Sequence, residues 1–462
     1  MCVAITAFAA YRIWQAFAGP PIGWNDSLDY ARSAVWAGSR PPLVPAVLGL
    51  AGSATTFVAV QVTVGVAAWV TLAFVACRSM PPRWRFPTLL VVLGFASTTA
   101  VVRWDRSVLS ESLAMSALAV LLAALLYAGD GPLSWWKVGA IVGAGALFAS
   151  VKDAHVWVVW LVAIFLAIDT VVRRRGAKGI AAAFGLALCA GALLGGSLSA
   201  HRADEPVAHA YFVRVFPYPD RVSWFAAHGM PDADIVRNYA RETVTPRGAA
   251  PVVVIDTADT RVQPLVHWLR DDGERVYTQW LVEHPWTTIT EPFRDPERAF
   301  NFANGDIGMY SAPGRTQLDL VDAMLFPHAV VVAVLAALGL AVGLRTGLHR
   351  RAWWWVVVVF GAIGVVHMLI AWHGDGMETT RHVSIANAQT RLCILVLVVA
   401  AVAEVSVTWR NGFLRRHAGT RTERGRREEL ARPQGSPRSG DAEGSPVREQ
   451  GTVRQLPVLP RS

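Results

Sequence analysis

The sequence predicts an all-α protein that crosses a membrane many times. Of its 462 residues, 53% are hydrophobic and only 17% are charged, which is too apolar for a soluble protein of this length. Apolar runs recur along the chain, many of them near the roughly 20 residues that a helix needs to cross a bilayer. We therefore predict about ten transmembrane helices with one long polar segment outside the membrane.

The loops between the predicted spans alternate in charge. Arginine-rich loops, such as those at 78–85, 173–178 and 345–351, should face the cytoplasm by the positive-inside rule. The remaining loops then share the extracytoplasmic face. We predict a protein of the bacterial plasma membrane, with both termini in the cytoplasm. The predicted spans cover approximately residues 1–17, 46–76, 86–102, 107–128, 137–151, 154–171, 179–199, 327–344, 353–372 and 383–409.

Three of these spans are unusual. The run 46–76 is longer than one crossing needs, so its first turns are predicted to form a separate re-entrant or interfacial helix. The run 138–151 would make a helix of about 21 Å, short of the roughly 30 Å hydrocarbon core, which would place Lys152 below the headgroups. The first span begins at Met1 without a basic flank and is interrupted by Arg12, so we expect the natural start to lie upstream.

The chain divides into four predicted parts. Residues 1–199 form an N-terminal transmembrane module, 200–326 an extracytoplasmic cap, and 327–409 the C-terminal transmembrane helices. Residues 410–462 are rich in Arg, Gly, Pro, Ser and Glu, which predicts a disordered basic tail in the cytoplasm. The net charge of +9 is concentrated in this tail, so it does not indicate a nucleic-acid partner. The four cysteines lie in or beside apolar segments, and we predict neither a disulfide framework nor a metal site.

The first polar loop, NDSLDYARSA followed by RPPLVP, places charge at the membrane edge, where charge is costly and usually serves a function. Asp26, Tyr30 and Ala34 are spaced by four residues, which puts them on one face of a helix lying along the membrane surface. Arg40 precedes two prolines that set a rigid return into the bilayer. Asp26 is therefore the first candidate for a functional group, and a helix N-cap is its plainer alternative.

Other charged residues should reach the same side of the membrane from distant loops. The segment RWDRSVLSESL at 103–113 contains two acids, a lysine follows the short fifth span, and METTRH at 377–382 opens the last span. Each candidate has a plainer alternative: an ion pair of Asp105 with Arg103 or Arg106, a helix cap at Glu111, a snorkelling Lys152, and interface anchoring by Arg381 and His382.

These loops, in this order, resemble those of the GT-C glycosyltransferases, which include protein O-mannosyltransferases and bacterial aminoarabinose transferases. The resemblance covers roughly residues 10–200 and 325–410 as topology, although only four short motifs are specific. In those families the aspartate of the first loop is the proposed catalytic base, a role that the resemblance carries to Asp26. The acidic residue that usually follows it is Ser27 here. The resemblance also implies a second acidic position at Asp105 or Glu111.

The resemblance implies an enzyme that transfers a sugar, with inversion, from a polyprenyl-phosphate donor to an envelope glycan or lipid. Such a transfer needs a base for the acceptor hydroxyl and cations for the departing phosphate. The lipid-linked sugar is a co-substrate, no other cofactor is predicted, and a divalent metal remains an open alternative. Alternatives in function are a transporter or lipid-glycan flippase, or a silent relative that binds an envelope partner. The predicted catalytic residues are Asp26, Asp105 and Glu111; the predicted substrate-binding residues are Tyr30, Arg40, Arg103, Lys152, Arg381 and His382.

Overall fold

The protein is helical throughout the part of the chain that the computed structural model describes. This part comprises residues 1–23, 25–33, 40–129, 131–199, 204–231, 260–300, 319–374, 376 and 379–430. Within it, the one β-type pairing is an isolated bridge between Ile22 and Ser107. The chain separates into two compact units, Met1–Ser406 and Val407–Ser462.

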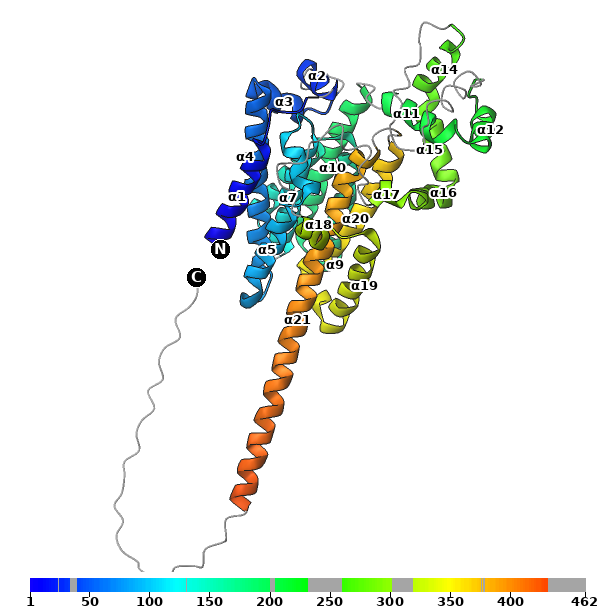
Figure 1. Ribbon diagram of the computed structural model, residues 1–462. Helices are drawn as coiled ribbons and strands as arrows, with labels where there is room; N and C mark the ends of the chain where they lie inside the picture. The colour runs from blue at the N-terminus through cyan, green and yellow to red at the C-terminus, as the bar shows by residue number, and fades with distance from the viewer. Residues whose placement is uncertain are drawn as a thin grey trace, which may run out of the picture. The chain divides into compact units, whose positions relative to one another are not determined.

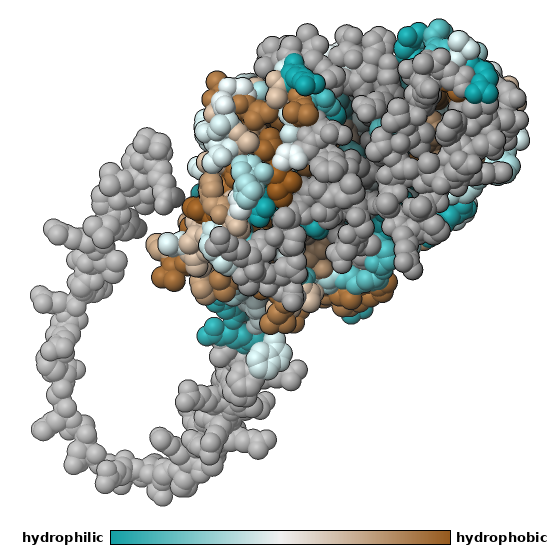
Figure 2. Space-filling view, turned by 45° about the horizontal axis from the view of Figure 1, so that its top comes forward, coloured by the Kyte–Doolittle hydropathy of each residue, from teal (hydrophilic) through white to brown (hydrophobic). Residues whose placement is uncertain are grey.

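Seven described helices are long and apolar enough to cross a membrane, as expected for a multi-pass membrane protein. They are α4 (Ala54–Arg78), α7 (Glu111–Gly129), α9 (Asp153–Arg173), α10 (Gly176–Ser199), α19 (Ala329–Thr346), α20 (Ala352–Gly374) and α21 (Thr379–Leu430) (Figure 1). Figure 2 shows apolar side chains, in brown, gathered on part of the surface of the unit Met1–Ser406.

The predicted count of about ten spans is not reached among the described residues, for reasons of length and bending. The helix α1 (Cys2–Ala16) and the helix α8 (Trp135–Ala149) have 15 residues each, about 22 Å. The predicted span 86–102 is a bent pair. The segment Pro82–Phe95, which contains α5 (Arg85–Phe95), and the segment Thr99–Arg106, which contains α6 (Thr99–Val102), meet at 49°. Counting this pair as one span raises the number to eight.

The long apolar run near residues 46–76 is two helices, so the prediction of a separate helix at its start is confirmed. The first, α3 (Leu43–Ala51), ends at Gly52, whose φ of 67° lies in the left-handed region that favours glycine. The second, α4, begins after Ser53, whose hydroxyl oxygen accepts a hydrogen bond from the Thr56 amide.

The helix α7 is the centre of the bundle. Of its apolar window, 83% is buried inside the protein, and it packs against α4, α8 and α20. Its sequence is rich in alanine, which lets neighbouring helices approach closely. Because α7 begins at Glu111, the centre of the bundle presents a carboxylate at one end.

The residues between α10 and α19 include a set of short helices that we call the cap. Its own core contains Tyr211, Phe216, Phe225, Tyr277 and Trp280. The cap elements are α11 (Asp204–Ala210), η3 (Tyr211–Val215), α12 (Pro219–Ala227), α14 (Gln263–Trp268), η4 (Leu269–Gly273), α15 (Glu274–Glu283), α16 (Pro285–Thr290), η5 (Glu291–Arg294) and α17 (Pro296–Phe300).

The spacing of apolar residues at 231–243 and at 262–284 predicts helices in the polar segment. The helical pattern at 262–284 is found as α14, η4 and α15, ending at Glu283 before Pro285. The pattern at 231–243 lies almost wholly outside the described residues. The start of the predicted tail, 410–430, continues α21 as helix to Leu430, and residues 431–462 lie outside the described part.

An ion pair deep in the bundle joins α1 to η2 (Arg103–Arg106), the turn before α7. Arg12 donates from Nε to Asp105 Oδ2 at 2.8 Å and from Nη2 to Asp105 Oδ1 at 2.5 Å, and both side chains are 0% exposed. Ser112 also donates to Asp105, at 2.8 Å. Gly65 leaves room for the guanidinium, since a Cβ there would lie 3.1 Å from Arg12 Nη2. The sequence predicted Arg103 or Arg106 as the partner of Asp105, and this prediction was wrong. The true partner, Arg12, is brought to Asp105 by the packing of α1.

We expect Arg12→Leu to destabilise the protein by about 3–5 kcal/mol, because it leaves the Asp105 carboxylate buried and uncompensated. Arg12→Leu combined with Asp105→Leu should recover most of this loss, since both charges are then gone. Thermal unfolding in detergent ranks the variants by stability. The control is Asp272→Asn, which removes an exposed pair with Arg275 and should change stability by about 1 kcal/mol or less. Equal effects of Arg12→Leu and the control would contradict a structural role for the pair.

Candidate functional site

Backbone contacts fix the first polar loop onto the turn that precedes α7. The Ile22 amide donates to the Arg106 carbonyl at 2.9 Å, and the Val108 amide donates to the Ile22 carbonyl at 2.9 Å. The Ser27 hydroxyl, in α2 (Asn25–Arg32), donates to the Val108 carbonyl at 2.7 Å. From α4, the buried Gln61 amide donates to carbonyls of the same turn, the closest at 2.6 Å. The start of α2 is thereby held beside the start of α7.

A continuous series of ion pairs lies at this end of the bundle, and we call it the charge chain. Arg381 of α21 donates from Nη2 to Asp26 Oδ2 at 2.6 Å and from Nε to Glu111 Oε1 at 2.7 Å. Lys152 donates to the same Glu111 oxygen at 2.6 Å. Arg40 donates to Asp26 Oδ1 at 2.8 Å. Residues 355 positions apart in the sequence therefore meet side by side.

Exposure is lowest in the middle of the charge chain and highest at its Arg40 end, while Lys152 at the other end is 13% exposed. The side chain of Glu111 is 0% exposed and that of Arg381 is 3% exposed, whereas Asp26 is 19% and Arg40 is 26% exposed. Burying charges costs more than a well-packed apolar core would, even when they are paired. Stability alone therefore gives no reason for this cluster, and its open end at Asp26 and Arg40 is where a ligand would first make contact.

The two cations at the inner end lie at the N-termini of helices. Arg381 is in the first turn of α21, and Lys152 is the N-cap residue of α9. The helix dipole disfavours a cation at this position and favours an anion. The acid Glu111, the first residue of α7, satisfies both cations. A helix N-terminus together with a cation is a suitable place for an anion such as a phosphate.

The acid at the open end of the charge chain is ionised at neutral pH. Burial opposes ionisation of Asp26, but Arg381 and Arg40 outweigh it and hold its pKa below the ordinary value. Tyr30 is 4% exposed and lies under Arg40, whose Cζ is 5.7 Å from the ring centroid. Burial raises the pKa of Tyr30 to about 12, so its hydroxyl stays neutral and can hydrogen-bond. Asp29 also accepts from Arg40, at 2.7 Å.

The structure brings six of the nine predicted site residues together in or beside the charge chain, and three lie elsewhere. Asp105 is held by Arg12 inside the bundle, which corrects its predicted catalytic role. The Arg103 guanidinium lies over the ring of Trp104, 6.0 Å from its centroid, and is not in the charge chain. His382 follows Arg381 directly in α21, and adjacent helical residues do not share a face. Asp375 and Glu378, which are close to Arg381 in the sequence, lie outside the described residues.

A second group of buried charges, which the sequence did not indicate, joins the cap to the start of α21. Glu291 accepts from Arg214 at 3.2 Å and from Arg221 at 3.1 Å, and we call this group the clamp. Arg214 also donates to the Thr379 hydroxyl at 3.4 Å, two residues before Arg381. Burial opposes ionisation of Glu291, but Arg214 and Arg221 outweigh it, and its pKa is lowered.

A glycine in the turn between α20 and α21 lets this turn lie directly against the cap. A Cβ at Gly376 would collide with the His209 carbonyl and lie 3.0 Å from Ala210 Cα, both in α11. No larger residue fits there without moving α11 or the turn. Close backbone contact and the clamp together fix the start of α21, and thereby the position of Arg381.

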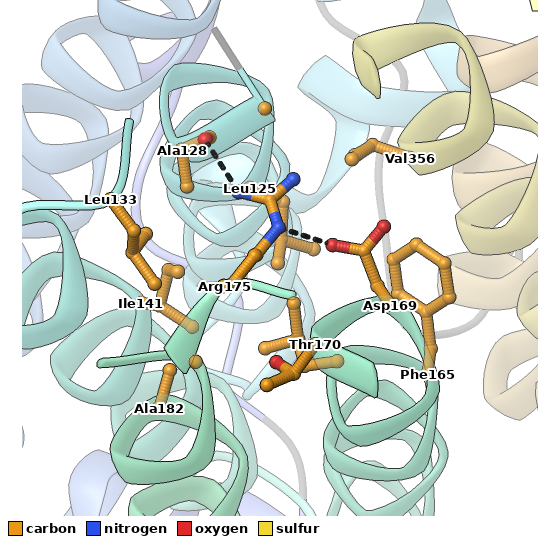
Figure 3. Close-up of a pocket in the computed structure, with 13 residues that line it drawn as sticks. Leu125, Ala128, Leu133, Ile141, Phe165, Asp169, Thr170, Arg175, Ala182 and Val356 are labelled. Carbon is orange, nitrogen blue, oxygen red and sulfur yellow. Dashed lines mark hydrogen bonds and ion pairs between the residues drawn. The ribbon is translucent and has the colours of Figure 1, made fainter. Parts of the chain in front are cut away.

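A small hollow of about 20 Å³ lies at the opposite end of the bundle (Figure 3). Its charged lining residues pair with one another: Arg175 Nε forms an ion pair with Asp169 Oδ2 at 2.5 Å, and Arg175 Nη1 donates to the Ala128 carbonyl at 3.4 Å. It is about 27 Å from Glu111 along α7, so it is separate from the charge chain. Within the described residues, no group of three or more His, Cys, Asp or Glu side chains is arranged to hold a metal.

Comparison with family models, with curated proteins and with solved structures gives no match. Support for a function therefore comes from the charge chain itself.

The lowered pKa of Asp26 predicts how its contribution to stability varies with pH. Asp26→Asn should destabilise the protein by about 1–2 kcal/mol at neutral pH, because Arg381 and Arg40 lose a charged acceptor. A group whose pKa is lowered on folding stabilises the fold above its unfolded pKa, about 3.9. This stability is lost as the pH falls through the lower folded pKa. The difference between wild type and variant should thus be constant from about pH 5 to 8 and shrink below about 4.

Thermal unfolding in detergent between pH 3 and 8 measures this difference. Asp29→Asn is the matched control, since Asp29 is in the same helix and contacts the same arginine but is 47% exposed. It should change stability less at every pH. A wild-type advantage over Asp26→Asn that grows on acidification would contradict the lowered pKa.

Proposed function

We propose that the protein is a membrane glycosyltransferase of the GT-C type. It transfers a sugar from a polyprenyl-phosphate donor to an envelope glycan or lipid at the extracytoplasmic face of a bacterial plasma membrane, and both termini lie in the cytoplasm. One observation supports the proposal above all: Asp26, Arg381, Glu111 and Lys152 meet in one partly open cluster at one end of the bundle. This is the combination of base and cations that the reaction requires.

In the proposed reaction Asp26 is the general base. An acceptor hydroxyl transfers its proton to the Asp26 carboxylate while its oxygen forms a bond to the anomeric carbon of the donor sugar. The bond from that carbon to the phosphate oxygen breaks, and its electron pair leaves with the polyprenyl phosphate. A single displacement inverts the anomeric centre. Asp26, at the open end of the charge chain, is accessible to an acceptor hydroxyl.

The cations of the charge chain stabilise the departing phosphate. The leaving group gains one negative charge as the bond breaks, and Arg381, Arg40 and Lys152 can offset it in a site with little water. Glu111 holds Arg381 and Lys152 in position through one oxygen, 2.7 and 2.6 Å from their nitrogens. Glu111 is a positioning residue in this mechanism. The ring of the buried Tyr30 packs against the Arg40 guanidinium.

The same arginines bind the base and would bind the phosphate, and this couples donor binding to base activation. In the structure Asp26 accepts from both Arg40 and Arg381, which weakens it as a base because its pKa is lowered. A donor phosphate competes with Asp26 for these donors. When the phosphate takes them, the pKa of Asp26 rises towards its ordinary value, so the base becomes stronger only when the donor is in place.

Asp26→Asn should lower the rate of sugar transfer about 10²–10⁴-fold, because the amide cannot accept the proton. The measurement is release of polyprenyl phosphate from labelled polyprenyl-phosphate sugars in proteoliposomes supplemented with envelope lipid extract. The control Asp29→Asn should retain most of the activity. Transfer by Asp26→Asn at the wild-type rate would exclude Asp26 as the base, and lipid movement without transfer would favour the transporter alternative.

Binding of polyprenyl phosphate tests the cations separately from the chemistry. Arg381→Gln and Arg40→Gln should each weaken binding in nanodiscs about tenfold or more, since each removes a charged hydrogen bond to phosphate. Asp26→Asn should bind at least as tightly as wild type, because it removes the competitor for both arginines. Arg103→Gln, from a neighbouring turn outside the charge chain, is the control and should bind normally. Weaker binding by Asp26→Asn would contradict the competition between carboxylate and phosphate.

A further inference from the structure

One element of the cap exposes three large apolar side chains and buries a carboxylate, although Arg294 of the same element is exposed. In α16 and η5, Trp286 is 77%, Ile289 46% and Phe293 59% exposed, and we call these three side chains the α16 face. Glu291 of the same element is buried. A surface helix in water buries its apolar side chains and exposes its charges. The opposite arrangement indicates surroundings that are apolar.

The inward side of this element is held by polar contacts. Glu291 is the acid of the clamp, with Arg214 and Arg221 as its partners. The Thr288 carbonyl is hydrogen-bonded to His373 Nε2 at 2.9 Å. These bonds fix the rotation of the element about its own axis. Trp286, Ile289 and Phe293 therefore cannot turn inward without breaking the clamp.

The contact with His373 also gives the position of the element relative to the membrane. His373 is the penultimate residue of α20, one of the helices long and apolar enough to cross. The element α16 packs against α20, so it lies where that helix ends (Figure 1). Tryptophan is enriched at this level of membrane proteins, where one side of the ring meets hydrocarbon and the other meets headgroups.

We propose that the α16 face inserts into the headgroup region of the bilayer beside the end of α20, so that the cap rests on lipid. A protein partner suits this surface less well. A stable protein interface buries roughly 800 Å² on each partner, far more than three side chains on this short element, of 6 residues in α16 and 4 in η5, can supply. Lipid needs no such area, because the span itself already holds the element at the bilayer surface.

Lipid contact at this place would stabilise the geometry around Arg381. The element that carries the α16 face also carries Glu291, which orients Arg214 against Thr379 at the start of α21. Anchoring α16 thus limits how far the cap can move away from the helix that bears Arg381. This inference concerns where the cap lies, and it holds or fails independently of sugar transfer.

Spin labels on single cysteines test the proposal. Cys2 and Cys189, which are not buried, are first replaced by serine, while the buried Cys77 and Cys393 remain. Ile289→Cys and Phe293→Cys are then labelled on the full chain in nanodiscs of phosphatidylcholine and phosphatidylglycerol. The matched control is Thr278→Cys, an exposed residue of α15 in the same cap. Oxygen, which concentrates in lipid, and a water-soluble nickel complex are the two relaxing agents.

Labels at 289 and 293 should collide severalfold more with oxygen than with the nickel complex, and the control label should show the reverse. Nickel accessibility at 289 and 293 equal to that at 278 would place the α16 face in water and overturn the proposal. Protection of both labels from both agents would mean that a protein surface covers the face, which overturns it equally. Two labelled sites guard against local disturbance at either one.

Discussion

The Arg381 guanidinium between two carboxylates is the interaction on which this end of the protein depends. Its Nη2 reaches Asp26 and its Nε reaches Glu111, so one side chain of α21 connects the first polar loop with the central helix. At 3% exposure, and in the first turn of a helix whose dipole disfavours a cation, Arg381 needs both acids. Each acid in turn holds a further cation, and the charge chain extends from this residue in both directions.

The contrast between Asp26 and Asp105 separates a candidate site from a structural ion pair. Both aspartates accept two hydrogen bonds from arginine, but Asp105 takes both from Arg12, and the two side chains are completely buried. This bidentate pair is closed, and a ligand has no access to it. Asp26 instead divides its two oxygens between Arg40 and Arg381, and remains partly exposed. Only the second arrangement allows exchange of partners.

Much of the site could be predicted from the sequence, because membrane topology is simple. Alternating spans place every second loop on the same side, so Asp26, Glu111, Lys152 and Arg381 could be assigned to one face from the arginines of the other loops. The pairing of Arg12 with Asp105 could not, because it requires the packing of α1 against α4 and η2. The predicted number of spans was too high where helices are short or bent. The helices α1 and α8 are short, and apolar composition does not determine where a helix ends.

Under the proposed function, the short α8 accounts for a charged cluster that is buried and yet within reach of the lipid donor. At about 22 Å, α8 is shorter than a hydrocarbon core of about 30 Å. Lys152 follows directly, and the Leu43 amide at the start of α3 donates to the Ser150 carbonyl at 3.1 Å. In the predicted topology, the length of α8 places Lys152, at the inner end of the charge chain, below the headgroups. For the proposed donor, whose phosphate lies at that surface and whose tail lies in lipid, a recessed site lets the phosphate reach Arg381 and Lys152 without the tail leaving the membrane.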